Sequence, residues 1–164
     1  MIDAFGTEIA YLCCMLQIDK SEKNIAFLIS SETSLVDNIL KEAESFVGRA
    51  NGENRSGLMI VLRELLLNAL IHGNKNVAER HIKCRIEKLE KARLRIEVED
   101  EGSGFAYQSI DMRLPENPRH LKRRGYVLIN ALSDRIEFNS SGNCITAYVT
   151  LNQESFWIGK SLQR

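Results

Sequence analysis

The sequence predicts a two-layer α/β sandwich of the α+β class, with about three helices on one face of a mixed, mostly antiparallel sheet. Two stretches, 81–100 and 135–151, alternate apolar with polar or charged residues, a pattern typical of half-buried antiparallel strands. Other stretches carry apolar residues at helical spacing. Because these strands and helices occupy separate segments, we expect them to form separate layers.

The first half of the chain predicts one strand and two helices. The apolar run "NIAFLIS" (24–30) predicts a strand. Residues 31–48 begin with Ser and Thr capping residues, continue with helical apolar spacing and end at a glycine, so they predict a helix. A second helix is predicted over about 56–71, followed by His-Gly-Asn at 72–74, which is typical of a helix C-cap.

The second half predicts two hairpins separated by a loop and a helix. The first hairpin covers 81–100, and the loop that follows it, 102–123, contains both prolines of the chain. A third helix is predicted to begin at Gly125. The last hairpin covers 135–151, with its turn at 140–143.

Composition bounds the class of protein. Apolar residues make up 44% of the 164 residues and charged residues 27%, as in ordinary globular proteins. The 22 basic and 22 acidic residues cancel, so we expect neither direct nucleic-acid binding nor attraction to a membrane surface. The four cysteines form no CxxC pair and have no zinc-ligand spacing, which indicates reduced thiols and a cytoplasmic protein.

Three polar residues interrupt the apolar helix "ELLLNALIHGN" (64–74). Glu64, Asn68 and His72 are four residues apart, and each step turns about 40° around a helix, so they form one polar stripe. The apolar residues lie largely away from this stripe and are expected to face the sheet: Leu62, Leu65, Leu66, Ala69 and Leu70. The stripe therefore lines either a polar cavity or a solvent-exposed helix face.

A second unusual segment is "VEDEGSGF" (98–105), in which a predicted strand ends at Asp100 and is followed by Gly102 and Gly104. Glycines after a strand allow a sharp turn and the close approach of a ligand. The carboxylate of an aspartate at a strand end can accept a hydrogen bond from an exocyclic amine. An ordinary Asp-Glu-Gly turn is the alternative.

The third segment, "KRRGYVLINALSD" (122–134), places a glycine and the start of a helix directly after three basic residues. Free N–H groups at a helix N-terminus bind phosphate, and nearby cations add to that attraction. A basic loop followed by a core helix is the alternative interpretation.

Together the three segments resemble the N, G1 and G2 boxes of the GHKL (histidine-kinase-like) ATPases, over roughly residues 24–151. Within that group the chain is most similar to the small bacterial anti-sigma-factor serine/threonine kinases of partner-switching systems. The resemblance implies a Bergerat-type ATP-binding fold. It divides the chain into an N-terminal extension of uncertain role (1–20), the ATPase domain (21–152) and a C-terminal tail (153–164).

The resemblance also implies roles for the site residues, with ATP and Mg²⁺ as cofactors. Asn68 matches the asparagine that coordinates magnesium, and Glu64 matches the glutamate that acts as, or positions, the general base. Asp100 matches the aspartate that binds the adenine amino group. Gly102 and Gly104 match the glycines that let adenine lie close to the backbone.

The G2 box departs from the family pattern. Arg123 replaces the first glycine of its GxG motif, and Gly125 is the second. Arg124 and Lys75 are expected to contribute cations to the phosphates. The substitution at 123 leaves two interpretations open, namely that arginine contacts the phosphates and activity is kept, or that it blocks the lid over the nucleotide.

The resemblance implies a kinase that phosphorylates a STAS-type anti-anti-sigma partner and sequesters a sigma factor. A non-catalytic GHKL partner-binding module and the ATP-binding portion of a two-component sensor are the alternatives. The chain's histidines do not lie in a matching heptad helix, so autophosphorylation on histidine is not expected. The apolar residues 9–18, too short to span a bilayer, favour either a homodimer interface or an additional buried strand.

Overall fold

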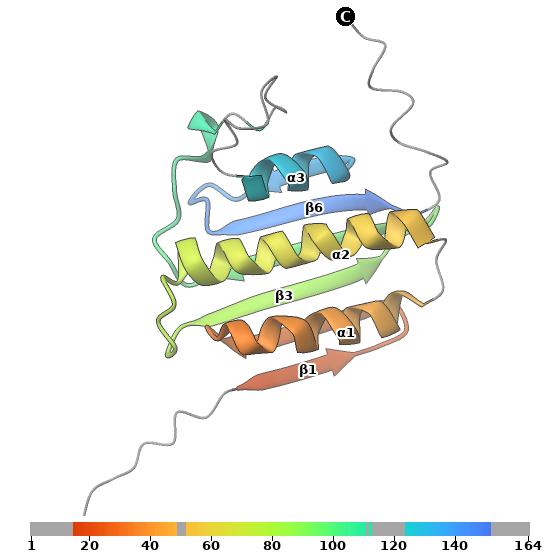
Figure 1. The fold of residues 1–164 in the computed structure, drawn as a ribbon, viewed down its shortest axis with the longest axis horizontal. Coiled ribbons are helices and arrows are strands. Elements are labelled where there is room, and N and C mark those ends of the chain that lie inside the picture. The colour runs from red at the N-terminus through yellow and green to blue at the C-terminus, as the bar shows by residue number, and fades with distance from the viewer. Residues whose placement is uncertain (1–14, 49–51, 111, 113–123, 152–164) are drawn as a thin grey trace, which may run out of the picture.

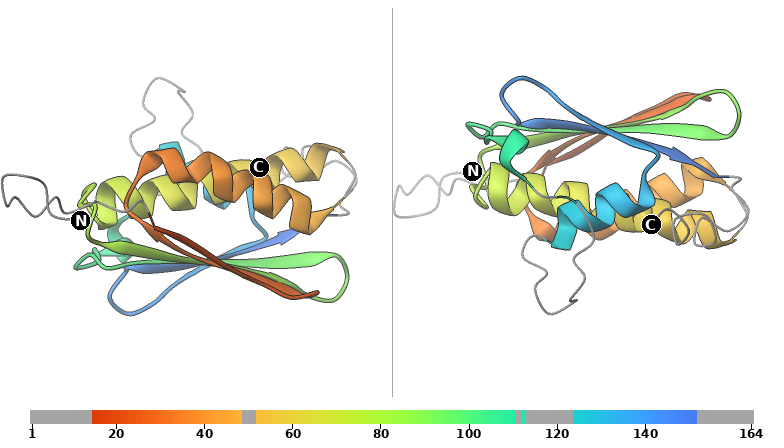
Figure 2. Two further views of the ribbon diagram at one scale, coloured as in Figure 1. Left: turned by 90° about the horizontal axis from the view of Figure 1, so that it is seen from below. Right: turned by 90° about the horizontal axis from the view of Figure 1, so that it is seen from above.

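The computed structural model describes residues 15–48, 52–110, 112 and 124–151. The predicted tail 153–164, the first fourteen residues of the predicted extension 1–20, and Arg123 lie outside the described residues. In the described part, three α-helices cover one face of a six-stranded sheet (Figure 1), and Figure 2 shows the two layers edge-on. The predicted two-layer sandwich is therefore confirmed.

The sheet has the strand order β1-β2-β3-β4-β6-β5. Its strands are β1 (Leu16–Lys20), β2 (Asn24–Ser30), β3 (His81–Lys88), β4 (Arg93–Asp100), β5 (Arg135–Phe138) and β6 (Cys144–Thr150). The predicted strand and both predicted hairpins are present as β2, β3–β4 and β5–β6. Every pairing among the described strands is antiparallel, so the sheet is not mixed in this part of the chain.

Strand β1 lies inside the segment whose role the sequence left open. Its five residues pair with β2 from Leu16 opposite Ile29 to Lys20 opposite Ile25, and they form one edge of the sheet. Four of the five are exposed. Residues 16–20 are therefore part of the sandwich.

The helices are α1 (Val36–Val47), α2 (Gly52–Leu67) and α3 (Arg124–Leu132). The predicted second helix, 56–71, begins earlier than expected and changes geometry at its end, because Asn68–Gly73 forms a π-helical turn, η2. In this wider turn the Asn74 N–H donates to the Ala69 carbonyl, five residues back, at 2.7 Å. Such turns are frequent at functional sites.

The core lies between the sheet and the helices. Alternate residues of the strands face α1 and α2, as Ile25, Phe27 and Ile29 do in β2. The apolar residues expected to face the sheet are buried: Leu62, Leu65, Leu66, Ala69 and Leu70. Each buried leucine contributes about 1.5–3 kcal/mol of hydrophobic free energy, so α2 is held firmly on the sheet.

Among the described residues, one helical stretch, Arg55–Gly73, is long and apolar enough to cross a membrane by length and composition alone. The core helix of a sandwich passes the same test. Its leucines Leu58, Leu62 and Leu65 are 0% exposed within the fold, so packing against the sheet accounts for its composition.

Candidate functional site

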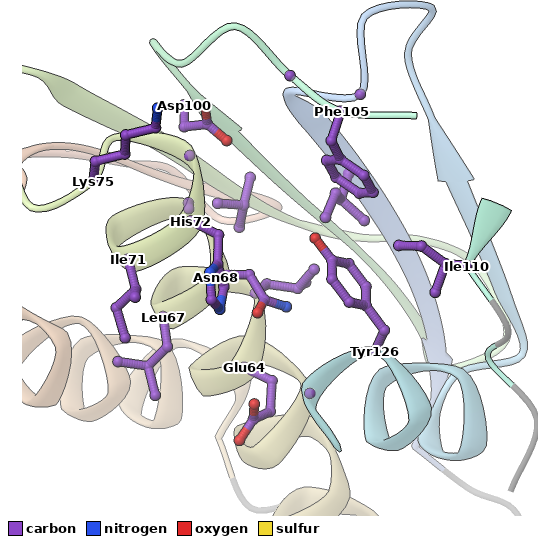
Figure 3. A pocket seen from close by; sticks show the side chains of 18 of the residues that line it. Glu64, Leu67, Asn68, Ile71, His72, Lys75, Asp100, Phe105, Ile110 and Tyr126 are labelled. Carbon is purple, nitrogen blue, oxygen red and sulfur yellow. The ribbon is translucent and has the colours of Figure 1, made fainter. Parts of the chain in front are cut away.

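A cavity of about 500 Å³ opens between the end of α2, the segment after β4 and the start of α3 (Figure 3). Six of the eight predicted site residues line it: Glu64, Asn68, Lys75, Asp100, Gly104 and Gly125. His72 lines it as well, so the polar stripe lies on a cavity wall rather than on an open helix face. Gly102 lies next to Asp100 and to the Gly73 carbonyl, outside the cavity lining. Arg124 is the first residue of α3, and its side chain lies outside the described part of the structure.

Asn68 begins the π-helical turn, and its side chain reaches the middle of the cavity (Figure 3). Its Nδ2 atom is buried and has no hydrogen-bond partner among the described residues. A buried polar atom without a partner costs about 1–3 kcal/mol, so such atoms call for an explanation. A bound ligand would supply the missing partner, and in either amide orientation Asn68 offers one donor and one acceptor.

Gly125 brings the start of α3 close to the polar stripe. A Cβ atom at this position would lie 2.7 Å from Glu64 Oε2 and 3.3 Å from Asn68 Oδ1, so no larger residue fits without displacing them. The N-terminal end of α3 is therefore next to both side chains. Because a helix N-terminus carries partial positive charge, this end of the cavity favours an anion.

Asp100 lies at the other end, as the last residue of β4 (Figure 3). Its Oδ1 accepts a hydrogen bond of 2.8 Å from the Gly102 N–H. A Cβ atom on Gly73 would lie 2.2 Å from Asp100 Cγ, and one on Gly102 would lie 2.3 Å from the Gly73 carbonyl oxygen. The carboxylate thus lies in close contact with Gly73 and Gly102, and a side chain at either position would collide with its surroundings.

The pKa of Asp100 is raised above its ordinary value, chiefly because burial disfavours the charged carboxylate. The Gly102 N–H bond works in the opposite direction and stabilises the carboxylate, Glu99 raises the pKa further, and Arg80 lowers it. The site therefore holds a half-buried carboxyl group, and its pKa depends on how far burial excludes water from it.

An apolar aromatic wall faces the polar stripe. Phe105 and Tyr126 line the cavity, with their ring centroids 5.6 Å apart. Phe138 packs behind Phe105 at 6.0 Å and stacks on Tyr107 at 4.6 Å. Large apolar surfaces with a few convergent polar groups are typical of small-molecule sites.

The polar groups follow one another along the cavity. Figure 3 shows Asp100 at one end, Asn68 in the middle and Glu64 at the end next to α3. This order suits an elongated ligand with an aminated ring at Asp100 and an anionic tail near Asn68 and α3. Lys75 lies at the Asp100 end in this view, so its phosphate contact stays a prediction, as does that of Arg124.

No cluster of three or more His, Cys, Asp or Glu residues that could hold a metal occurs in the part of the chain that the structure describes. Asn68 would then be a single protein ligand. That is compatible with Mg²⁺, which keeps several waters and takes one or two protein ligands together with substrate phosphates.

Sequence reasoning missed four residues at the Asp100 end: Gly73, Asn74, Gly142 and Asn143. The first two were interpreted as a helix C-cap and the last two as a hairpin turn. Gly142 has φ +78°, and a Cβ there would lie 2.3 Å from the Phe105 carbonyl oxygen. At Gly104, φ +72°, an added Cβ would lie still closer, 1.8 Å from the Ser141 carbonyl oxygen. These contacts join segments about forty residues apart, which local patterns do not reveal.

Residues 29–149 match the sequence model of a family described as the histidine kinase-like ATPase domain. No curated protein matches the chain. The solved histidine kinase domain of the blue-light activated histidine kinase from Erythrobacter litoralis EL346 is similar at 18% identity and TM-score 0.45, over 75% of this chain and 62% of that chain. Another structure of this kinase is similar at 18% identity and TM-score 0.48, over 77% and 43%. The chain thus spans less than two thirds of either structure.

Proposed function

The chain belongs to the family of histidine kinase-like ATPase domains, and from this premise we propose that it is an ATP-dependent protein serine/threonine kinase of the anti-sigma-factor type. The single observation that carries the proposal is the order of Asp100, Asn68 and Glu64 along one cavity of about 500 Å³. That order matches the base, the phosphates and the acceptor hydroxyl of a phosphoryl-transfer reaction.

Asp100 is the group that would recognise the base. Its carboxylate would accept a hydrogen bond from the exocyclic amine of adenine, while the aromatic wall of Phe105 and Tyr126 supplies apolar contact for the ring. A keto oxygen in place of the amine would face the carboxylate without a proton between them. The site would therefore prefer adenine to guanine.

Asn68 and the N-terminal end of α3 would hold the phosphates. The unpaired, buried Nδ2 atom and the close approach of Gly125 fit an anionic group at this point. Mg²⁺, when bound, neutralises phosphate charge, and the Asn68 amide oxygen is a suitable hard ligand for it. Phosphoryl transfer depends mainly on such positioning and charge stabilisation.

Glu64 would act on the acceptor. Its carboxylate lies beside the start of α3, where the last phosphate of a nucleotide bound in this orientation would end. It would accept the proton of a serine hydroxyl as the hydroxyl oxygen bonds to the γ-phosphorus and the bond to ADP breaks. The acceptor that we propose is a serine of a cytoplasmic STAS-type anti-anti-sigma protein, and the same surface would sequester a sigma factor.

The test is a Glu64→Gln variant, which keeps the size and hydrogen-bonding capacity of the side chain but removes its basicity. We expect ATP affinity within about twofold of the native protein and transfer of labelled γ-phosphate to purified STAS-type proteins reduced by about 10²–10⁴-fold. Transfer at the native rate by the variant would refute the role of Glu64. ATP binding without transfer to any such protein, combined with partner binding indifferent to ATP, would favour a non-catalytic module.

A further inference from the structure

Two asparagines outside the cavity wall hold the peptide group that joins Asp100 to Glu101. The first is Asn143, at the end of the β5–β6 turn. The Asp100 N–H donates to the Asn143 carbonyl at 2.9 Å, and the Asn143 Nδ2 donates back to the Asp100 carbonyl at 2.8 Å. The regular pairing of β4 with β6 ends one residue earlier, at Glu99 opposite Cys144. The Asn143 side-chain amide therefore supplies the donor to the Asp100 carbonyl that a backbone N–H would supply in a continuing strand pair.

The Asn143 amide is itself oriented by Asn139. Asn139 Nδ2 donates to Asn143 Oδ1 at 2.8 Å, which leaves the Asn143 Nδ2 to point at Asp100. Asn139 Oδ1 also accepts hydrogen bonds from the backbone N–H groups of Gly142, Asn143 and Cys144. The turn is thus preorganised before it contacts the Asp100 segment.

Asn74 holds the N–H side of the same peptide group. It is 0% exposed, and its Oδ1 accepts a hydrogen bond of 2.8 Å from the N–H of Glu101, the residue after Asp100. Its Nδ2 donates to Ser31 Oγ at 2.7 Å and to the His81 carbonyl at 2.9 Å, which ties the contact to the residue after β2 and to the start of β3. The peptide group between Asp100 and Glu101 is therefore held by both side-chain amides, with Asn143 bonded to its carbonyl and Asn74 bonded to its N–H.

We propose that Asn143 and Asn74 are positioning residues for base selection, because they set the direction of the Asp100 carboxylate without lining the cavity themselves. This inference rests on the proposed binding of ATP. Hydrogen bonds weaken steeply when their angle falls, and a displacement of about 1 Å at a site can cost about 10²-fold. Loosening either asparagine would therefore weaken recognition of the adenine amine while leaving contacts with the ring and the phosphates in place.

The test compares two nucleotides, ATP and purine riboside triphosphate, which lacks the exocyclic amine. Their dissociation constants are measured by calorimetry with the full chain and Mg²⁺. The native protein should bind ATP about 10–100-fold more tightly, as expected for one hydrogen bond to a charged group. Asn143→Ala should reduce this preference by at least about fivefold and leave the affinity for purine riboside triphosphate within about twofold.

Asn130→Ala is the matched control, since Asn130 is exposed on α3 and its Nδ2 donates to the Met112 carbonyl rather than to the Asp100–Glu101 peptide group. It should keep the native preference. If the Asn74→Ala variant folds, it should reduce the preference for ATP as Asn143→Ala does. If it does not fold, the result for Asn143→Ala alone tests the proposal. An unchanged preference in Asn143→Ala, or an equal loss for both nucleotides, would overturn the positioning role alone. Failure of the native protein to bind either nucleotide would overturn the proposed function as well.

Discussion

Replacement of Gly73 by alanine is the sharpest steric test of the Asp100 end. The new Cβ would lie 2.2 Å from Asp100 Cγ, whereas ordinary contact begins at 3.4 Å, so the carboxyl carbon must retreat by about 1.2 Å. Gly73 is not among the residues with positive φ, so its backbone accepts alanine without strain. A displacement of about 1 Å, with loss of one charged hydrogen bond worth about 1.5–3 kcal/mol, predicts ATP affinity lowered by about 10–100-fold.

The assay is a calorimetric or fluorescence titration with ATP, accompanied by a thermal melt to confirm folding. Gly57→Ala in α2 is the matched control, because its Cβ would meet only Leu132 at an ordinary 3.7 Å. In that helix interior, alanine should raise stability by about 0.5–1 kcal/mol and leave ATP affinity unchanged. Native ATP affinity in a folded Gly73→Ala variant would refute the claim that this glycine makes room for a base-binding carboxylate.

Four further outcomes are expected. Since burial raises the pKa of Asp100, ATP affinity should fall on acidification while the pH is still above 3.8, and Asp100→Asn should bind weakly without this pH dependence. The same raised pKa makes ionisation of Asp100 cost stability as pH rises above 3.8, so Asp100→Asn should melt no earlier than the native protein at neutral pH. Burial raises the pKa of Cys84 to about 12 and of Cys144 to about 11, so neither thiol should react with iodoacetamide at pH 8 until denaturant is added. Leu62→Ala should lower the free energy of unfolding by about 2–5 kcal/mol in a denaturant titration, since this side chain is fully buried.

Local patterns were sufficient to predict most of the sandwich. The strand at 24–30 and both hairpins follow from alternation, because one face of each strand is buried and the other is not. Glu64 and Asn68 were also recognisable, because their four-residue spacing places them on one face of a helix whose leucines face the sheet. Their placement on one cavity with Asp100 agrees with the order that the motifs imply.

The rest depends on contacts between distant segments. Strand β1 is short and mostly exposed, so it carries no clear alternation. The turn at 68–73 is π-helical, and the four-residue spacing of the polar residues in the sequence does not distinguish such a turn from an α-helix. Asn143 bonds to Asp100 across 43 residues, and within "SSGN" it signals only a turn. The glycines at 73 and 102 likewise serve a protein contact, which no local rule predicts.

The most direct test of the site is a titration of ATP into the purified chain by calorimetry, with and without Mg²⁺, using the native protein and Asn68→Ala. The buried, unpaired Asn68 amide in the middle of the cavity predicts binding that strengthens with Mg²⁺ in the native protein. In the variant both the binding and its dependence on Mg²⁺ should be lost. Absence of binding to the native protein, or binding indifferent to Mg²⁺ and to the loss of Asn68, would contradict the assignment of this cavity as the nucleotide site.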